Sequence, residues 1–218
     1  MNARKAVVIY SGGMDSFTLL HQVIQQGYQV YPVSFDYGQR HARELAAAKH
    51  VCQMLNLPHQ CIDLRSIQPL LDQSALTGQH PVPQGTYAPE NLQITLVPNR
   101  NMILLSLAIA YAVNLGANEC FYGAHGGDHV LYPDCRPEFV TGMDQMAQIS
   151  NLQPVRIRAP FLHYDKADIL RLGQAMHLDY ALTWTCYQGA EQPCGTCSAC
   201  HERAQAFAAC GCADPLIG

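Results

Sequence analysis

The sequence carries little charge and lacks any cluster of positive residues. Lysine and arginine number 13 against 17 aspartate and glutamate, which gives a net charge of −4 at neutral pH. The cationic residues are scattered along the chain. A protein that binds duplex DNA or transfer RNA normally has a basic stripe that offsets the phosphate charge. We therefore expect no nucleic acid partner.

Long hydrophobic runs are also missing. The longest apolar stretch, residues 102–113, is shorter than the ~20 residues that cross a bilayer. Near the N-terminus only residues 6–10 separate a basic start from the Ser-Gly-Gly string that follows, which is too short for the core of a signal peptide. The sequence predicts neither export nor membrane insertion, and hence a cytoplasmic protein.

What the chain does contain is enough apolar material for a core. Hydrophobic residues make up 49% of its 218 residues, which fit one sizeable domain and at most a small second module. Ten cysteines without an export signal indicate a reducing compartment. In such a compartment cysteines bind metal more often than they form disulfides.

Short apolar runs alternate with longer segments of helical period, as in proteins whose parallel strands are joined by helices. We predict strands near residues 5–10, 29–35, 60–63, 119–122 and 155–158. We predict helices at about residues 15–26, 41–55, 101–115, 138–149 and 166–177. Gly27, just after the first helix, is a typical stop signal. The sequence therefore predicts an α/β fold.

Two segments depart from this alternation. The helix at residues 101–115 is apolar on nearly all faces. We expect it to be buried between the sheet and another layer, which a partner subunit could supply. Residues 66–97 hold four prolines, so we predict no regular structure there and interpret the segment as a lid.

The strongest chemical signal is a six-residue turn between the first predicted strand and the first predicted helix. Its residues are Ser11, Gly12, Gly13, Met14, Asp15 and Ser16. The two glycines let backbone amides approach an anion, and the following helix directs its positive end to the same place. Asp15 is suited to orient Mg²⁺. The alternative interpretation is a Gly-Gly turn with a Ser or Asp helix cap and no ligand. The match over six residues favours a turn that holds phosphate.

The turn is similar to the S-G-G-x-D-S signature of the ATP-pyrophosphatase, or PP-loop, family. This resemblance implies a Rossmann-like five-stranded parallel sheet, with ATP at the carboxyl ends of its strands. It also implies that the β and γ phosphates are gripped, that the α-phosphorus is attacked, and that pyrophosphate leaves. The nucleotide contacts that we expect are Tyr10, Ser11, Gly12, Gly13, Met14, Asp15, Ser16, Phe17, Thr18, Leu19 and Leu20.

Three further motifs narrow the resemblance. They are FDYGQRH at residues 35–41, VPNRN at 97–101 and YPDCRPEF at 132–139. Each lies where an open α/β sheet places ligand contacts. Together with the turn they are similar to the 7-cyano-7-deazaguanine synthase family. Departures from the family pattern are Asn99, the string at residues 129–131 and the pair at residues 191–192. The string at 129–131, next to Asp128, bears on substrate preference.

The second strong signal is a C-x7-C-x2-C-x2-C arrangement. Its cysteines are Cys186, Cys194, Cys197 and Cys200. Four thiolates at these gaps can surround one tetrahedral Zn²⁺ and leave no open position, which predicts a structural metal. The resemblance also implies zinc. An iron–sulfur cluster is the alternative, but a ferredoxin run would need cysteine at Ala204.

The other cysteines carry weaker signals. Cys210 and Cys212 could replace one ligand, although we expect them to be unliganded because they lie near the chain end. Cys52, Cys61 and Cys120 fall in helix or strand patterns, so we predict that they are core residues.

Site residues outside the turn follow from the resemblance. Lys166 resembles a lysine that follows the last strand in the family, where it would neutralise charge on the reacting phosphate or carboxyl oxygen. Lys166 and Asp15 form the predicted catalytic set. His125 is a candidate for handling protons. The predicted substrate-binding residues are Tyr37, Arg100, Asp134 and Arg136.

The implied function is that of an ATP-dependent carbon–nitrogen ligase. It would convert 7-carboxy-7-deazaguanine and ammonia to 7-cyano-7-deazaguanine, a queuosine precursor, through an adenylated carboxylate and an adenylated amide. Residues 1–180 would form the ATP-binding domain and residues 181–218 a zinc module packed on it. The family resemblance also implies a homodimer with Mg²⁺ beside ATP.

Three other functions share parts of this pattern. An amide-forming PP-loop ligase would stop after the first adenylation. A transfer RNA-modifying enzyme of the same family would need a basic face or an added RNA-binding domain. A non-catalytic zinc-binding interaction module would be expected to have lost Asp15 or Ser16, and both are present.

Overall fold

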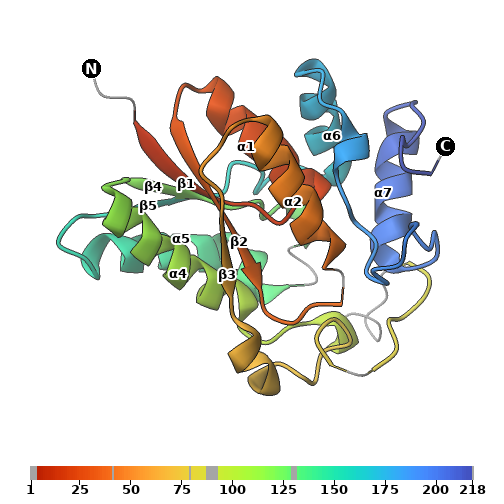
Figure 1. Cartoon of the computed structure of the whole chain (residues 1–218), viewed down its shortest axis with the longest axis horizontal. Helices are drawn as coiled ribbons and strands as arrows, with labels where there is room; N and C mark the ends of the chain where they lie inside the picture. The colour runs from red at the N-terminus through yellow and green to blue at the C-terminus, as the bar shows by residue number, and fades with distance from the viewer. Residues whose placement is uncertain (1–3, 41, 79, 87–92, 129–131, 218) are drawn as a thin grey trace.

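The computed structural model describes residues 4–40, 42–78, 80–86, 93–128 and 132–217. Five parallel strands form one sheet in the order β3-β2-β1-β4-β5 (Figure 1). The strands are β1 Lys5–Ile9, β2 Gln29–Asp36, β3 Gln60–Asp63, β4 Glu119–Phe121 and β5 Arg156–Arg158. The predicted α/β class and the five-stranded parallel sheet are confirmed.

Helices cover both faces of the sheet (Figure 1). One face is covered by α1 Met14–Gln25, α2 Arg43–Met54 and α6 Lys166–Ala175. The other is covered by α4 Arg100–Leu115 and α5 Pro137–Ile149. All five predicted helices are present, although His41, the predicted start of α2, lies outside the described residues. A parallel sheet needs this double cover because both of its faces are apolar.

The first strand shows how the two cores are divided. Ala6, Val8 and Tyr10 belong to the apolar cluster that includes α1 and α6. Val7 belongs to the cluster that includes α4 and α5. Successive side chains of a strand point to opposite faces, so an unbroken apolar run serves both cores. Such a run is typical of a central parallel strand.

Local signals set the helix ends. Gly27, with φ +81°, follows α1, as the stop signal predicted. Pro137 occupies the first position of α5, where its missing N–H leaves no bond unmade. Asp165 caps α6 by accepting from the backbone N–H of Asp168, whose side chain accepts in return from the backbone N–H of Asp165. The cap fixes the start of α6, where Lys166 stands.

Within the part of the chain that the structure describes, the apolar helix α4 is buried on one face and partly exposed on the other. Leu105, Ala108 and Ala112 are buried against the sheet, whereas Met102 and Leu107 are 41% and 37% exposed. Among the described residues the sheet supplies one of the two predicted layers, so the second layer, which a partner subunit could supply, stays a prediction. By length and composition alone, the stretch Gln93–Leu115 is long and apolar enough to cross a membrane. The core helix of a soluble protein can be equally long and apolar, so these two properties are weak evidence of a membrane segment.

The proline-rich segment at residues 66–97 is less irregular than predicted. It shares the 3₁₀ helix η1, Arg65–Leu70, which takes Pro69 into its last turn. Farther along, Val82 packs in a small cluster with Trp184, and the backbone N–H of Gly85 donates to Thr196 O over 2.8 Å. Residues 82–85 thus lie on the C-terminal part of the chain, whereas Leu71, Leu76 and Val97 pack in the apolar cluster that includes α4 and α5. Its role as a lid stays a prediction.

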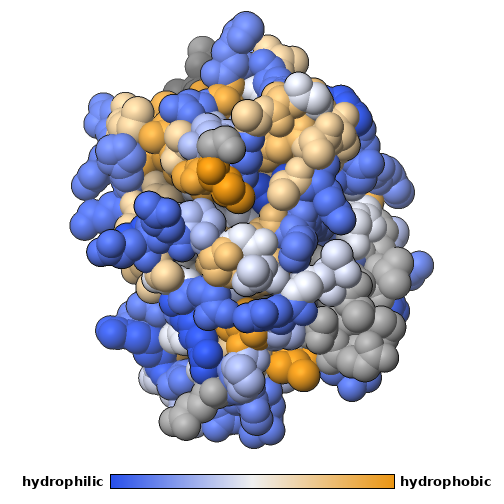
Figure 2. All heavy atoms as spheres, turned by 90° about the vertical axis from the view of Figure 1, so that its right-hand side faces the viewer, coloured by the Kyte–Doolittle hydropathy of each residue, from blue (hydrophilic) through white to orange (hydrophobic). Residues whose placement is uncertain are grey.

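One helix, α7 Ser198–Ala209, was not predicted. It lies beside α6 (Figure 1) and buries Ala206 and Phe207 in the apolar cluster that includes α1 and α6. On this side of the molecule, hydrophobic residues reach the surface in separate patches between hydrophilic ones (Figure 2). The buried residues of α7 do follow a helical period, but they include a cysteine and an arginine, which hid the apolar stripe.

Candidate active site and four-cysteine cluster

A cavity opens where the strand order reverses. The chain runs from β1 outward to β3 and then returns to place β4 on the other side of β1. Open α/β sheets bind ligands at this point, outside the carboxyl ends of the strands. The cavity here has a volume of about 240 Å³. Its walls include residues of the turn after β1, such as Ser11 and Ser16, and of the loop after β4, such as Gly123 and Asp128.

The turn after β1 has the close packing that its glycines permit. Gly12 has φ +94°, and a Cβ atom there would lie 2.1 Å from the backbone O of Glu44 in α2. Inside the turn, the N–H of Gly13 donates to Ser11 Oγ and the Ser16 hydroxyl donates to Gly13 O, both over 3.1 Å. These bonds hold the shape of the turn, and the close approach of Gly12 to Glu44 packs it against α2. Only glycine tolerates both the backbone angle and the contact at position 12.

The N-terminus of α1 points into this turn. Gly13 is the N-cap, its backbone is extended, and no side chain of the described residues caps the helix. The first backbone N–H groups of a helix have no partner within the helix. Together with the helix dipole they form an anion site. The turn therefore has the properties of a phosphate cradle.

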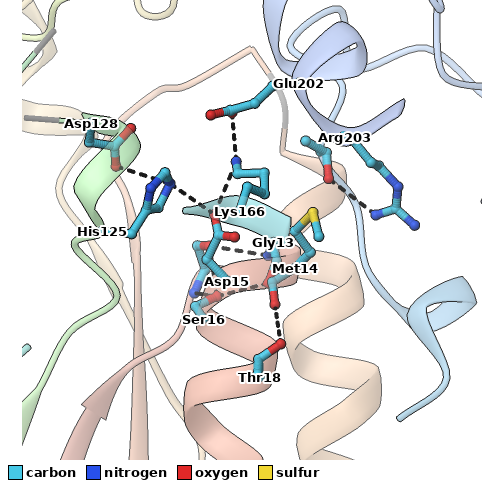
Figure 3. Close-up of polar contacts among 12 residues, drawn as sticks. Gly13, Met14, Asp15, Ser16, Thr18, His125, Asp128, Lys166, Glu202 and Arg203 are labelled. Atoms are coloured by element: carbon cyan, nitrogen blue, oxygen red, sulfur yellow. Dashed lines mark hydrogen bonds and ion pairs between the residues drawn. The ribbon is translucent and has the colours of Figure 1, made fainter. Parts of the chain in front are cut away.

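Charged side chains converge beside the cradle (Figure 3). Lys166 Nζ lies 3.2 Å from Asp15 Oδ2 and 2.6 Å from Glu202 Oε2. His125 Nε2 lies 3.7 Å from Asp15 Oδ2 and 3.4 Å from Asp128 Oδ2. Asp15 comes from α1, Lys166 from α6 and Glu202 from α7, whereas His125 and Asp128 follow β4. The site is thus assembled from four distant parts of the chain.

The surroundings shift the pKa values of three carboxyl groups in the cavity. Burial alone would raise the pKa of Asp15, but Lys166 and His125 outweigh it, so this pKa is lowered. Burial raises the pKa of Asp128, and its interactions with His125 and Lys166 only partly offset this. Burial raises the pKa of Glu44 to about 8 despite the charge of Arg100. Asp15 is therefore the carboxylate best suited to stay ionised at neutral pH.

Several buried polar atoms at the cavity have no hydrogen-bond partner among the described residues. They are Tyr10 Oη, Asp15 Oδ1, Tyr122 Oη and His125 Nδ1. A buried polar atom without a partner destabilises the fold. Such atoms at a cavity wall are satisfied when a polar ligand or water binds. The site is thus suited to a ligand with several hydrogen-bonding groups.

The structure separates the predicted nucleotide contacts into two groups. Tyr10, Ser11, Gly13, Met14, Asp15 and Ser16 line the cavity. Gly12, Phe17, Thr18, Leu19 and Leu20 are not among its lining residues, and the last four are buried between α1 and neighbouring elements. The Thr18 hydroxyl, for example, donates to Met14 O. A nucleotide contact from this second group stays a prediction.

The predicted substrate residues are also divided. Tyr37 and Arg100 line the cavity. Asp134 and Arg136 are not among its lining residues, and Asp134 Oδ2 instead accepts from the backbone N–H of Asn101 over 3.0 Å, at the start of α4. A role for Asp134 and Arg136 in substrate recognition stays a prediction. The departures at His129, Val130 and Leu131 lie outside the described residues.

Sequence reasoning missed two acidic residues of the cavity, Glu44 and Glu202. Glu44 follows the FDYGQRH motif by three positions, and Glu202 stands between Cys200 and the buried Arg203. Glu44 lies on the predicted helix α2, and Glu202 lies on α7, where only the cysteines gave a signal. The available signal was their place beside motifs that had already been recognised.

The four predicted metal ligands come together. The sulfur atoms of Cys186, Cys194, Cys197 and Cys200 all lie within 4.8 Å of one another. Four thiolates at this spacing suit one tetrahedral ion without an open position. The four-cysteine cluster is therefore confirmed.

The remaining cysteines differ in burial. Cys52 and Cys120 are buried, as predicted, but Cys61 is exposed. The prediction for Cys61 is wrong because β3 is an edge strand and this side chain is left uncovered. Cys135 is buried in the cavity wall.

The cluster is tied to the phosphate cradle. The backbone N–H of Trp184, two residues before Cys186, donates to Gly12 O over 3.0 Å. Arg203 on α7 is 2% exposed, and its guanidinium donates to both carboxylate oxygens of Asp214 over 2.7 and 2.8 Å. The C-terminal part of the chain therefore forms one wall of the cavity and is held there by specific bonds.

Two solved structures share this fold. NMN synthetase from Francisella tularensis matches with a TM-score of 0.55 and 13% identity, over 97% of this chain and 79% of that one. NH3-dependent NAD synthetase from Campylobacter jejuni matches with a TM-score of 0.50 and 17% identity, over 84% of this chain and 68% of that one. At such low identity the likeness shows the fold alone.

Sequence relatives are much closer. A family model described as queuosine biosynthesis protein QueC matches residues 5–211. The 7-cyano-7-deazaguanine synthase of Chromohalobacter salexigens is 61% identical over 214 residues, 98% of this chain and 85% of that protein. The 7-cyano-7-deazaguanine synthase of a Marinomonas species is 55% identical over 214 residues, 98% of both chains. The chain therefore belongs to the QueC family of 7-cyano-7-deazaguanine synthases.

Proposed function

We propose that this chain converts 7-carboxy-7-deazaguanine and ammonia to 7-cyano-7-deazaguanine by two successive adenylations in the cavity described above. Its family is that of ATP-dependent ligases of queuosine biosynthesis. The single observation that carries the proposal is the uncapped N-terminus of α1 beside Asp15 and Lys166 at the point where the strand order reverses. This arrangement offers a triphosphate an anion site and offers the reacting phosphate a cation.

The chemistry explains why adenylation is needed. A carboxylate repels nucleophiles, and oxide cannot leave from it. Attack of the carboxylate oxygen on the α-phosphorus of ATP forms an acyl adenylate and releases pyrophosphate. Ammonia then attacks the acyl carbon, and AMP leaves with the oxygen that came from the carboxylate. The product of this first round is the amide.

The second round removes the remaining oxygen. The amide oxygen attacks the α-phosphorus of a second ATP and pyrophosphate leaves. Loss of AMP and protons from the adenylated amide then forms the carbon–nitrogen triple bond. Each nitrile therefore corresponds to two AMP and two pyrophosphate. In both rounds we assign Lys166 to the negative charge that develops on the α-phosphate.

Mg²⁺ is part of the proposal. Asp15 has a lowered pKa, and its Oδ1 has no hydrogen-bond partner among the described residues, so it fits a hard cation that prefers carboxylate oxygen. Such an ion would offset charge on the departing pyrophosphate. For the four-cysteine cluster we propose Zn²⁺ in a structural role, because four thiolates leave it no position for substrate.

Substrate contacts are assigned from the cavity wall. We propose that the Tyr37 ring stacks on the deazaguanine and that Arg100 binds its oxygen atoms, since both line the cavity near the end of β2. Burial raises the pKa of Tyr37, which favours a neutral hydroxyl there. We also assign Asp134 and Arg136, just before α5, to the guanine-like edge of the substrate, although neither is among the residues that line the cavity.

The proposal extends to assembly and location. The exposed apolar residues Met102 and Leu107 on α4 support a homodimer in which a second copy covers this helix. Four convergent thiols support a reducing, cytoplasmic location. We further propose that residues 181–218 act as a zinc module on an ATP-binding domain formed by residues 1–180.

The rival function is a ligase that stops at the amide, because it shares every step of the first round. Purified protein incubated with the carboxylate, Mg-ATP and ammonium separates the two. We expect mass spectrometry to find the nitrile and nucleotide analysis to find two AMP for each nitrile. Accumulation of the amide with one AMP would support the rival, and formation of ADP without AMP would contradict both.

A further inference from the structure

The four-cysteine segment supplies a side chain to the active-site cavity. Glu202 lies on α7, two residues after Cys200, and lines the cavity together with Thr185, Tyr187 and Ala199 of the same part of the chain. Its carboxylate points toward the Lys166 ammonium group and contacts it (Figure 3), with 2.6 Å between Oε2 and Nζ. A segment whose metal has only a structural role thus contacts the predicted catalytic lysine.

Lys166 is held between two carboxylates. Its Nζ atom lies 3.2 Å from Asp15 on the cradle and 2.6 Å from Glu202 on α7. The side chain of Lys166 is 11% exposed, and that of Glu202 is 21% exposed. A lysine side chain has a flexible four-carbon stem, so a single partner leaves its position loosely defined. Partners on two different elements restrict the ammonium group to the space between them.

The backbone that carries Glu202 is firmly anchored. The next residue, Arg203, is 2% exposed and forms a two-bond ion pair with Asp214. Farther along α7, Phe207 packs in the apolar cluster that also includes Leu170 of α6. The helix thus holds Glu202 in place from the cysteine cluster on one side and from the core on the other. Rigid support of this kind is what precise placement of a catalytic group requires.

We propose that Glu202 is a positioning residue that holds the Lys166 ammonium group over the phosphate cradle. With Mg-ATP in the cradle, Asp15 would hold the cation, and Glu202 would remain to keep Lys166 beside the α-phosphate. The inference rests on the role of Lys166 given under the proposed function. It makes the four-cysteine segment part of the catalytic apparatus in addition to its part in the fold.

The test compares Glu202→Gln, Glu202→Asp, Lys166→Met and the double variant Lys166→Met/Glu202→Gln. Glutamine keeps the size of the side chain and removes its charge, whereas aspartate keeps the charge and shortens the reach. The matched control is Glu191→Gln, because Glu191 is an exposed acid of the same segment. For each full-length protein, kcat and KM for Mg-ATP, Tm and metal content are measured.

We expect E202Q to lower kcat by roughly 10²-fold, as misplacement of a catalytic group does, with little change in KM for ATP, Tm or metal content. E202D should recover part of kcat, and E191Q should match the unchanged protein. The double variant should be no slower than K166M, because Glu202 acts through Lys166.

Several results would overturn the inference. Unchanged kcat in E202Q, while K166M is inactive, would remove Glu202 and leave the role of Lys166 intact. Unchanged kcat in K166M would refute the proposed role of Lys166 itself. If E202Q lost metal or melted at a lower temperature in step with its loss of kcat, Glu202 would be structural. A double variant much slower than K166M would show that Glu202 acts independently.

Discussion

The α/β body and the C-terminal segment of this molecule are stabilised in different ways. The body has a five-stranded sheet with a large apolar cluster on each face. The segment from residue 181 onward has a small cluster of its own, in which Cys186, Cys197 and Cys200 are half of the buried members, and it adds Ala206 and Phe207 to one cluster of the body. Apolar periodicity thus specifies the body, whereas the chemistry of a few side chains specifies the segment.

Both regions nevertheless meet at one cavity. The body supplies the phosphate cradle with Asp15, and the segment supplies Glu202. The backbone bond from Trp184 to Gly12 joins the two directly. Loss of the segment should therefore abolish activity while the body stays folded.

Loss of the metal should have the largest effect. We expect Cys197→Ser to lose the bound metal and the nitrile-forming activity, because metal binding by four thiolates contributes about 10 kcal/mol or more to the folding of small metal sites. The sheet body should keep its circular dichroism. Metal analysis, activity and circular dichroism check this. The control is Cys61→Ser, since Cys61 is exposed and outside the cluster. Full activity in metal-free C197S would contradict the comparison.

The buried ion pair of the segment should come next. Asp214→Asn leaves the guanidinium of Arg203 buried without its charge partner, which costs about 3–5 kcal/mol of stability. Thermal unfolding with and without bound metal measures the loss. The control is Asp63→Asn, which removes the carboxylate of an exposed pair with Arg65 at 2.6 Å. Exposed pairs contribute little, so this variant should unfold like the unchanged protein. Equal effects of the two changes would refute the account of α7 as anchored by burial.

Within the body, the phosphate cradle should be sensitive to substitution. Gly12→Ala places a Cβ atom 2.1 Å from Glu44 O at a φ of +94°. Left-handed backbone and overpacking together should cost roughly 2–5 kcal/mol. Nucleotide binding should be lost as well, because the turn must move away from α2.

Gly142 gives a control for that change. It lies within α5, and a Cβ atom there would meet nothing within 4 Å. Gly142→Ala should therefore raise stability by about 0.5–1 kcal/mol, because alanine favours the helix. Calorimetry and ATP titration of both variants check the pair. Wild-type ATP binding by G12A would show that the close approach of α2 is unnecessary.

The smallest effect concerns the pH dependence of stability. Burial raises the pKa of Glu44 from 4.5 to about 8 in the folded protein. Between these values the folded state binds more protons than the unfolded state, so stability falls as pH rises from 4.5 to 8. Glu44→Gln should flatten this decline. Tm measured across that pH range, with Glu138→Gln on the exposed surface of α5 as control, tests it. An unchanged slope in E44Q would show that Glu44 does not carry the effect.

The sequence was most informative where periodicity or motif spacing carries the fold. The parallel strands, the phosphate turn and the cysteine cluster followed from such patterns. The helix α7 did not, because its inward face includes Cys200 and Arg203 in place of apolar residues. The exposure of Cys61 depends on strand order, since only an edge position leaves it uncovered.

Contacts between side chains that are far apart in sequence could not be predicted, for a different reason. Glu202 meets Lys166 only because α6 and α7 pack side by side. Asp134 accepts from Asn101 because the loop before α5 lies over the start of α4. Neither partner can be inferred from spacing along the chain. The site was therefore predictable as a region, and its individual pairs were not.

The most direct test of the account follows the oxygen atoms of the substrate. Carboxylate labelled with ¹⁸O at both positions is converted with Mg-ATP and ammonium, and the AMP is analysed by mass spectrometry. If both rounds proceed by attack on the α-phosphorus, every AMP formed with the nitrile carries one ¹⁸O in its phosphate. Unlabelled AMP, or label in inorganic phosphate accompanied by ADP, would contradict adenylation at the cradle after β1.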